Sequence, residues 1–153
     1  MRQRTLSIGF ALLFVSAVLH AADDPFAGTW KYNFAKSTHD EESAVQMTRL
    51  LEPFDGGMKF TRDAIDAKGK PLHTVYIIKF DGKDYPPEGG AGPTNAYRRI
   101  DRSTLECIVK FPGGNVMKQV LVLSKDGKTF TLTESGKYQS GKPANHFSVF
   151  EKQ

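Results

Sequence analysis

The sequence predicts an all-β domain, an antiparallel up-and-down β-barrel of about eight or nine strands. β-type segments recur every 8 to 15 residues from position 44 onward. Short turns rich in Gly, Asp and Pro join most of them, which favours antiparallel neighbours over a parallel or Greek-key arrangement. No segment has a clear helical period.

Residues 1–22 have the pattern of a secretory signal peptide ahead of this barrel. Two arginines provide a basic start, an uncharged run follows from Leu6 to Leu19, and small residues precede the junction at Ala22. The apolar run is shorter than the roughly 18 to 20 residues that span a membrane. We therefore expect a periplasmic or secreted protein in which residues 23–153 form a single domain.

The composition excludes several classes of protein. The formal net charge of +4 falls by two when the leader arginines are removed, and charges of both signs are interspersed. Such a mild charge predicts no nucleic-acid partner and no binding to an anionic membrane. Cys107 is the only cysteine, so no intramolecular disulfide can form and stability depends on the β core.

The first expected strand, Phe26 to Lys31, contains the only tryptophan of the chain, Trp30. Gly28 lacks a Cβ atom and lets the backbone enter the strand at an angle that other residues resist. This Gly-x-Trp pattern resembles the opening of calycin barrels, the group of lipocalins and fatty-acid-binding proteins. The resemblance implies that Trp30 closes one end of the barrel.

The remaining elements follow from alternation and turn chemistry. Ser37 or Thr38 is expected to cap a single helical turn, Pro53 to end the next strand, and Gly69 to take positive φ in a hairpin. Tyr85 to Pro93, rich in Pro and Gly, is the longest irregular loop and is expected at the barrel rim. The further expected strands are 45–51, 58–64, 72–80, 95–100, 105–111, 116–123, 130–133 and 145–151.

Alternation in the strand 105–111 places Cys107 on the core side. Leu105, Cys107 and Val109 share one face, opposite Glu106 and Lys110. A thiol among apolar neighbours behaves as a small, inert hydrophobic group. Cys107 is therefore not expected to be a nucleophile.

A set of motifs spread over nearly the whole mature chain resembles a group of small, exported bacterial proteins described as lipocalin-like. The resemblance implies a barrel of the lipocalin or fatty-acid-binding-protein type, and it implies no particular activity. In lipocalins an arginine on the last strand packs on the tryptophan, and here the last strand has none. Arg49, Arg62, Arg98 and Arg99 are the candidates to replace it. The motifs are 28–31, Asn33, 35–37, 80–86, 99–101, 124–129 and 149–152.

Two features of the sequence, a spacing like that of a phosphate-binding loop and a set of three histidines, are not expected to form functional sites. Gly136 to Lys142 has the spacing of a phosphate-binding loop, but Pro143 stands where that loop needs Ser or Thr, so a flexible hairpin is expected. His39, His73 and His146 are widely spaced and belong to different elements. We therefore predict no metal site, no cofactor and no enzymatic activity.

Tyr76, Tyr97 and Arg98 are the candidate ligand-binding residues, because all three lie on expected strands of a barrel wide enough to hold one small ligand. Ordinary cross-strand packing is the alternative role for each. The function predicted is binding of a small hydrophobic or amphipathic molecule without catalysis. The alternative is a structural or protein-interaction barrel filled by its own side chains, for which the candidates are Phe60, Phe111, Met117, Phe130, Phe147 and Phe150.

The signal-peptide assignment predicts a processed protein that begins at Asp23 or Ala22. The intact mass of the exported protein measures this directly. A mass that includes residues 1–22 would contradict the assignment.

Overall fold

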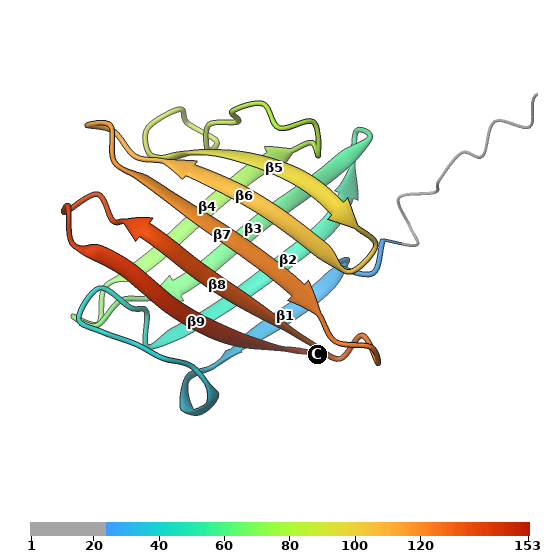
Figure 1. Ribbon diagram of the computed structural model, residues 1–153, viewed down its shortest axis with the longest axis horizontal. Helices are drawn as coiled ribbons and strands as arrows, with labels where there is room; N and C mark the ends of the chain where they lie inside the picture. Colours follow the sequence, from blue (N-terminus) through green and yellow to red (C-terminus); the bar gives the residue numbers. More distant parts are fainter. Residues whose placement is uncertain (1–23) are drawn as a thin grey trace, which may run out of the picture.

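Nine antiparallel strands curl into one barrel, confirming the predicted fold class (Figure 1). The structure is a computed structural model that describes residues 24–153, so the expected signal peptide lies outside the described residues. The sheet order is β4-β3-β2-β1-β9-β8-β7-β6-β5. The elements are β1 (Gly28–Asn33), the short 3-10 helix η2 (Phe34–Lys36), β2 (Gln46–Phe54), β3 (Gly57–Ile65), β4 (Pro71–Ile78), β5 (Thr94–Asp101), β6 (Thr104–Lys110), β7 (Val116–Leu123), β8 (Thr129–Lys137) and β9 (Pro143–Lys152).

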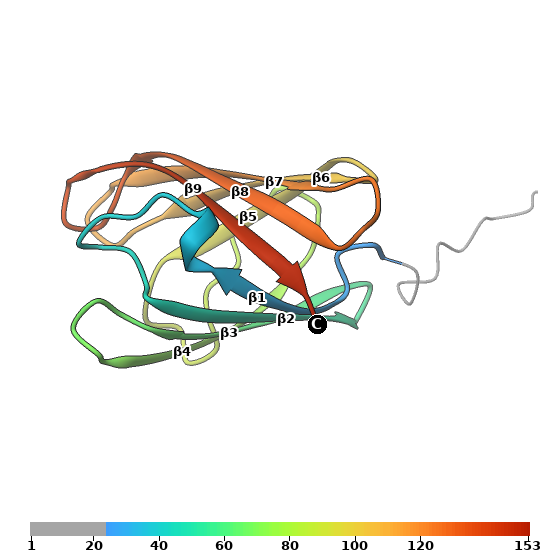
Figure 2. The ribbon, with the colours of Figure 1, turned by 90° about the horizontal axis from the view of Figure 1, so that it is seen from below.

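The barrel is flattened, with β2 to β4 facing β5 to β8 across the interior (Figure 2). β1 joins the two halves, because it pairs with β2 along one side and with β9 along the other. β4 and β5 are the two edges of the sheet and form no ladder with each other. The barrel is therefore nearly closed, with one seam between β4 and β5.

The Pro- and Gly-rich loop Tyr85–Pro93, expected at the rim, lies along this seam (Figure 1). Tyr85 and Asn95 exchange two backbone hydrogen bonds of 3.0 and 2.9 Å. The backbone N–H of Glu88 donates to the carbonyl of Val75 at 2.8 Å. The loop thus bonds to backbone groups of both edge strands, at Val75 and Asn95, and leaves less of each edge free to pair with another chain.

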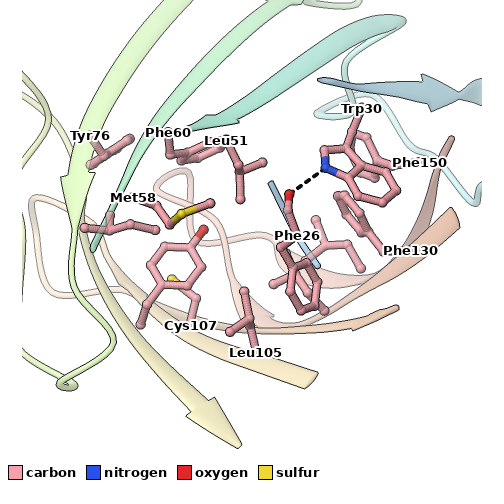
Figure 3. Packing of buried hydrophobic residues seen from close by; sticks show 14 of the residues in the cluster. Phe26, Trp30, Leu51, Met58, Phe60, Tyr76, Leu105, Cys107, Phe130 and Phe150 are labelled. Atoms are coloured by element: carbon pink, nitrogen blue, oxygen red, sulfur yellow. Dashed lines mark hydrogen bonds between the residues drawn. The ribbon is translucent and has the colours of Figure 1, made fainter. Parts of the chain in front are cut away.

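Trp30 closes one end of the barrel, as the calycin resemblance implied (Figure 3). Its indole Nε1–H donates to the carbonyl of Phe26 at 2.8 Å. Its ring meets that of Phe130 edge-on at a centroid distance of 4.9 Å, and Phe130 stacks on Phe150 at 4.7 Å. All four aromatic side chains have at most 1% exposure, so this end is filled.

Lys152 on β9, rather than any of the four candidate arginines, covers the tryptophan. Lys152 is the register partner of Trp30, and its Nζ lies 5.1 Å from the centroid of the indole ring. A Cβ atom on Gly28 would approach Lys152 Cε to 3.0 Å, and its φ of +125° also favours glycine. Arg99 instead stacks on Phe80 at 4.3 Å and forms an ion pair with Asp24.

Three local expectations are corrected by the register of the strands. Phe147, a candidate for filling the interior, is 41% exposed, because it lies three positions from buried Phe150 and so faces outward. Pro53 remains inside β2, because β1 pairs only up to Leu51 and needs no N–H from Pro53. Asn33 caps η2, accepting from the N–H of Lys36, in place of Ser37 or Thr38.

Two other expectations are confirmed. Gly69 has a φ of +79° in the turn between β3 and β4, where the Asp66 carboxylate accepts from two backbone N–H groups. Cys107 is 0% exposed and lies between buried Leu105 and Val109 on the inner face of β6.

We expect the substitution Trp30→Ala to lower the free energy of unfolding by about 3 to 5 kcal/mol, the usual cost of truncating a large buried aromatic side chain. Urea denaturation measures this. The control is Phe54→Ala, since Phe54 is 51% exposed and its loss should cost less than about 1 kcal/mol. Equal losses in the two variants would contradict a closing role for Trp30.

Candidate ligand-binding cavity

A cavity of about 240 Å³ occupies the half of the barrel away from Trp30. Its walls combine apolar and polar side chains from both halves of the barrel. The apolar part includes Phe60, Val109, Met117 and Leu132, and the polar part includes Arg49, Arg62, Tyr76, Tyr97, Gln119 and Glu134. Such a mixture of apolar surface and a few polar groups is typical of sites for small molecules.

Two of the three predicted site residues, Tyr76 and Tyr97, line this cavity. Tyr76 is 4% exposed, and its hydroxyl donates to the carbonyl of Pro93 at 3.1 Å, which ties β4 to the loop Tyr85–Pro93, called the seam loop below. Tyr97 is 3% exposed, and burial raises the pKa of its phenol well above the usual value. Both hydroxyls therefore stay protonated at neutral pH.

Arg98, the third predicted residue, lies on the outer face of β5 and does not line the cavity. Consecutive residues of a strand point to opposite faces, so Tyr97 and Arg98 cannot both face the interior. The structure therefore separates Arg98 from the two tyrosines.

The interior instead contains two other arginines, Arg49 of β2 and Arg62 of β3, which are direct register partners. Arg49 is 5% exposed, with its Cζ 4.7 Å from the centroid of the Phe150 ring and 5.4 Å from that of Phe60. Burial lowers the pKa of Arg49, and burial together with the charge of Arg49 lowers the pKa of Arg62. Arginine nevertheless stays charged in proteins.

A carboxylate and an amide face these arginines from the opposite half of the barrel. Glu134 of β8 and Gln119 of β7 are register partners, and Gln119 Nε2 donates to Glu134 Oε1 at 2.7 Å. The bond orients the carboxylate within the cavity lining. The result is a polar cluster, consisting of Arg49, Arg62, Gln119 and Glu134, within a wall of mixed apolar and polar side chains.

The segment between η2 and β2 contributes Glu42, Ser43 and Ala44 to the cavity lining, a part of the lining called the mouth below. The segment is tied to β9 and to the hairpin before it. His146 Nε2 lies 2.9 Å from a carboxylate oxygen of Asp40, and Lys142 forms an ion pair with Glu41. Thr38 exchanges hydrogen bonds with the backbone of Phe147. His146, from which the sequence predicted no metal site, thus lines the cavity and pairs with Asp40.

Residues 24–153 contain neither a cluster of metal-ligating side chains nor a membrane-spanning helix. No three His, Cys, Asp or Glu side chains in this part of the chain lie close enough together to hold a metal ion. The same residues contain no helix with the length and hydropathy that crossing a membrane requires.

Comparison with solved structures finds β-barrels. The chain is similar to a redesigned β-barrel with 13% sequence identity and a TM-score of 0.50, covering 87% of this chain and 94% of that chain. A second match is the redesigned β-barrel mFAP1 bound to DFHBI, with 14% identity and a TM-score of 0.47 over 86% and 97% of the two chains. No family model and no curated protein matches the chain. The first similarity supports the barrel fold.

Sequence reasoning missed the inward arginines, although a signal for them is present. Arg49 alternates with Met47 and Leu51, and Arg62 alternates with Phe60 and Ala64. An arginine on the apolar face of an alternating strand indicates either a buried polar group or an error of register. In the structure both arginines lie inside the barrel, so they are buried polar groups and the register is correct.

Cys107 should react slowly with a thiol reagent in the native protein. Burial raises the pKa of its thiol to about 12, so little of the reactive thiolate forms at pH 7 to 9. Labelling with a chromogenic disulfide reagent, with and without denaturant, measures this. The control is Thr133→Cys on the exposed face of β8, which should label at the rate of free cysteine. Rapid labelling of native Cys107 would contradict its burial.

Proposed function

We propose that the barrel binds one small amphipathic molecule in its cavity, without chemical turnover. The observation that supports this most is the division of the barrel interior into two halves. The half around Trp30 is filled by aromatic side chains, while the other half retains about 240 Å³ of space. Drug-sized ligands occupy pockets of roughly 300 to 1,000 Å³, so a ligand here is small.

The lining supports an amphipathic rather than a purely apolar ligand. Val109, Met117 and Leu132 offer apolar surface, whose burial against a ligand contributes roughly 25 cal/mol per Å². The polar cluster Arg49, Arg62, Gln119 and Glu134 offers hydrogen bonds at fixed positions within the same space. A wholly apolar ligand would displace water from Arg49 and Arg62 without offering them hydrogen bonds, which is unfavourable.

Two boundaries of the cavity are candidates for ligand entry. The mouth belongs to the segment that His146 and Lys142 hold in place. The seam loop contributes Pro93 to the lining and is held to β4 by the Tyr76 hydroxyl. The segment at the mouth is held mainly by ion pairs and the seam loop by a few hydrogen bonds rather than by a strand ladder, so either boundary can open locally without unfolding the barrel.

Cys107 and two histidines bear on the proposed absence of turnover. A nucleophilic cysteine requires a thiolate, and the pKa of about 12 keeps the Cys107 thiol protonated. His73 contacts Asp63 in an exposed pair, and His146, which belongs to the cavity lining, contacts Asp40. These contacts are consistent with a structural role for both histidines.

We further propose that the chain is an exported, lipocalin-like bacterial protein of the periplasm or the cell exterior. The proposal rests on the signal-peptide pattern of residues 1–22 and on the motifs that resemble that group. The barrel fold supports the lipocalin-like part of it. A carrier or sensor of a small molecule suits such a location.

Fluorescence titration with 2-naphthol, a small neutral amphipathic fluorophore, tests the binding function. We expect saturable binding to one site with a dissociation constant between about 10 and 1,000 µM, corresponding to about 4 to 7 kcal/mol. Ser148→Phe, which places a ring in the cavity lining, should abolish binding.

The matched control is Thr133→Phe, which adds the same ring to the exposed face of the neighbouring strand β8 and should leave binding intact. Binding that survives Ser148→Phe would place the probe elsewhere. No binding to the native protein would favour the structural or protein-interaction alternative.

A further inference from the structure

Arg49 and Arg62 bring two permanent positive charges together inside the barrel. They are directly opposite each other on neighbouring strands, an arrangement that destabilises a sheet when the charges are alike. In the described part of the chain, the ion pairs within 4.0 Å include neither guanidinium. Charges removed from water without a partner are strongly unfavourable.

Glu134 compensates only one of these two charges. It is part of the cavity lining, where Gln119 orients its carboxylate. The other carboxylate of the lining, Glu42, belongs to the segment at the mouth and lies 3.8 Å from Lys142 Nζ. The polar cluster thus carries an excess of one positive charge.

The hydrogen-bonding capacity of the two arginines is also largely unused. The Nε of Arg62 is buried and has no hydrogen-bond partner. The Nε of Arg49 contacts only the Met47 sulfur, a weak acceptor, at 3.4 Å. Phe150 and Phe60 pack on the Arg49 guanidinium, which restricts its motion without using its N–H groups.

We propose that the ligand of the cavity is a small monocarboxylic acid, bound as its anion by Arg49 and Arg62. This inference rests on the proposed function and specifies its ligand class. One negative charge balances the excess of the polar cluster, and a planar carboxylate accepts paired hydrogen bonds from guanidinium groups. The apolar body of the acid lies against Val109, Met117 and Leu132.

A matched pair of ligands, 2-naphthoate and the neutral 2-naphthamide, separates this inference from the proposed function. The two have the same skeleton and nearly the same shape and differ in charge. We expect the purified native protein to bind the acid at least about tenfold more tightly than the amide in calorimetric or fluorescence titrations at pH 7. Equal affinity for the two would overturn the inference and leave the proposed function standing. Failure of both to bind would overturn the proposed function as well.

Variants locate the preference within the cavity. Arg62→Gln should weaken binding of the acid much more than binding of the amide, so that the preference for the acid falls to less than about threefold. Arg98→Gln removes an arginine of the outer face of β5 and is the matched control, which should keep the full preference. Glu134→Gln removes the competing negative charge and should tighten binding of the acid. If Arg62→Gln keeps the full preference for the acid, the assignment of the site to this arginine pair is overturned. The comparison of acid and amide on the native protein tests the inference even if a variant fails to fold.

Discussion

The packing of Trp30 at the start of β1 is the interaction on which the rest of the barrel depends. β1 joins the two halves of the sheet, so a large side chain fixed there holds both halves at one end. The indole N–H is satisfied by Phe26, and Lys152 covers the ring from β9. Because apolar burial is concentrated at this end, the opposite end can contain polar groups and space without loss of the fold.

The polar end of the interior is built at a cost in stability. Two register-paired arginines repel each other, and removing them from water is unfavourable. Stacking on Phe60 and Phe150 offsets part of this for Arg49. An apolar pair at these positions would pack the barrel more simply, and proteins commonly retain such unfavourable arrangements where function requires them. The arginine pair is therefore the feature of this chain that most clearly points to a ligand.

The seam between β4 and β5 gives the barrel a second unusual property. A complete ladder would remove both sheet edges, whereas here the loop Tyr85–Pro93 covers them with isolated bridges and a few hydrogen bonds. The Tyr76 hydroxyl reaches from the cavity lining to Pro93, so the seam and the interior share a side chain. Opening of this side would break fewer hydrogen bonds than opening of a ladder, which fits the proposal that the seam is one route into the cavity.

The sequence by itself determined the barrel class, the strands, the turn at Gly69 and the inward orientation of Cys107. These depend on alternation and on turn residues, which act within a few positions along the chain. Alternation along the strands also indicates that Arg49 and Arg62 point into the barrel. It indicates as well that Arg98 points outward, because its neighbour Tyr97 points inward. Only the tertiary structure decided that Lys152 covers Trp30, that the loop Tyr85–Pro93 lies along a seam, and that Glu134 and the arginines share one cavity. Each of these depends on the register between strands distant in sequence, and that register is set by how the whole barrel closes.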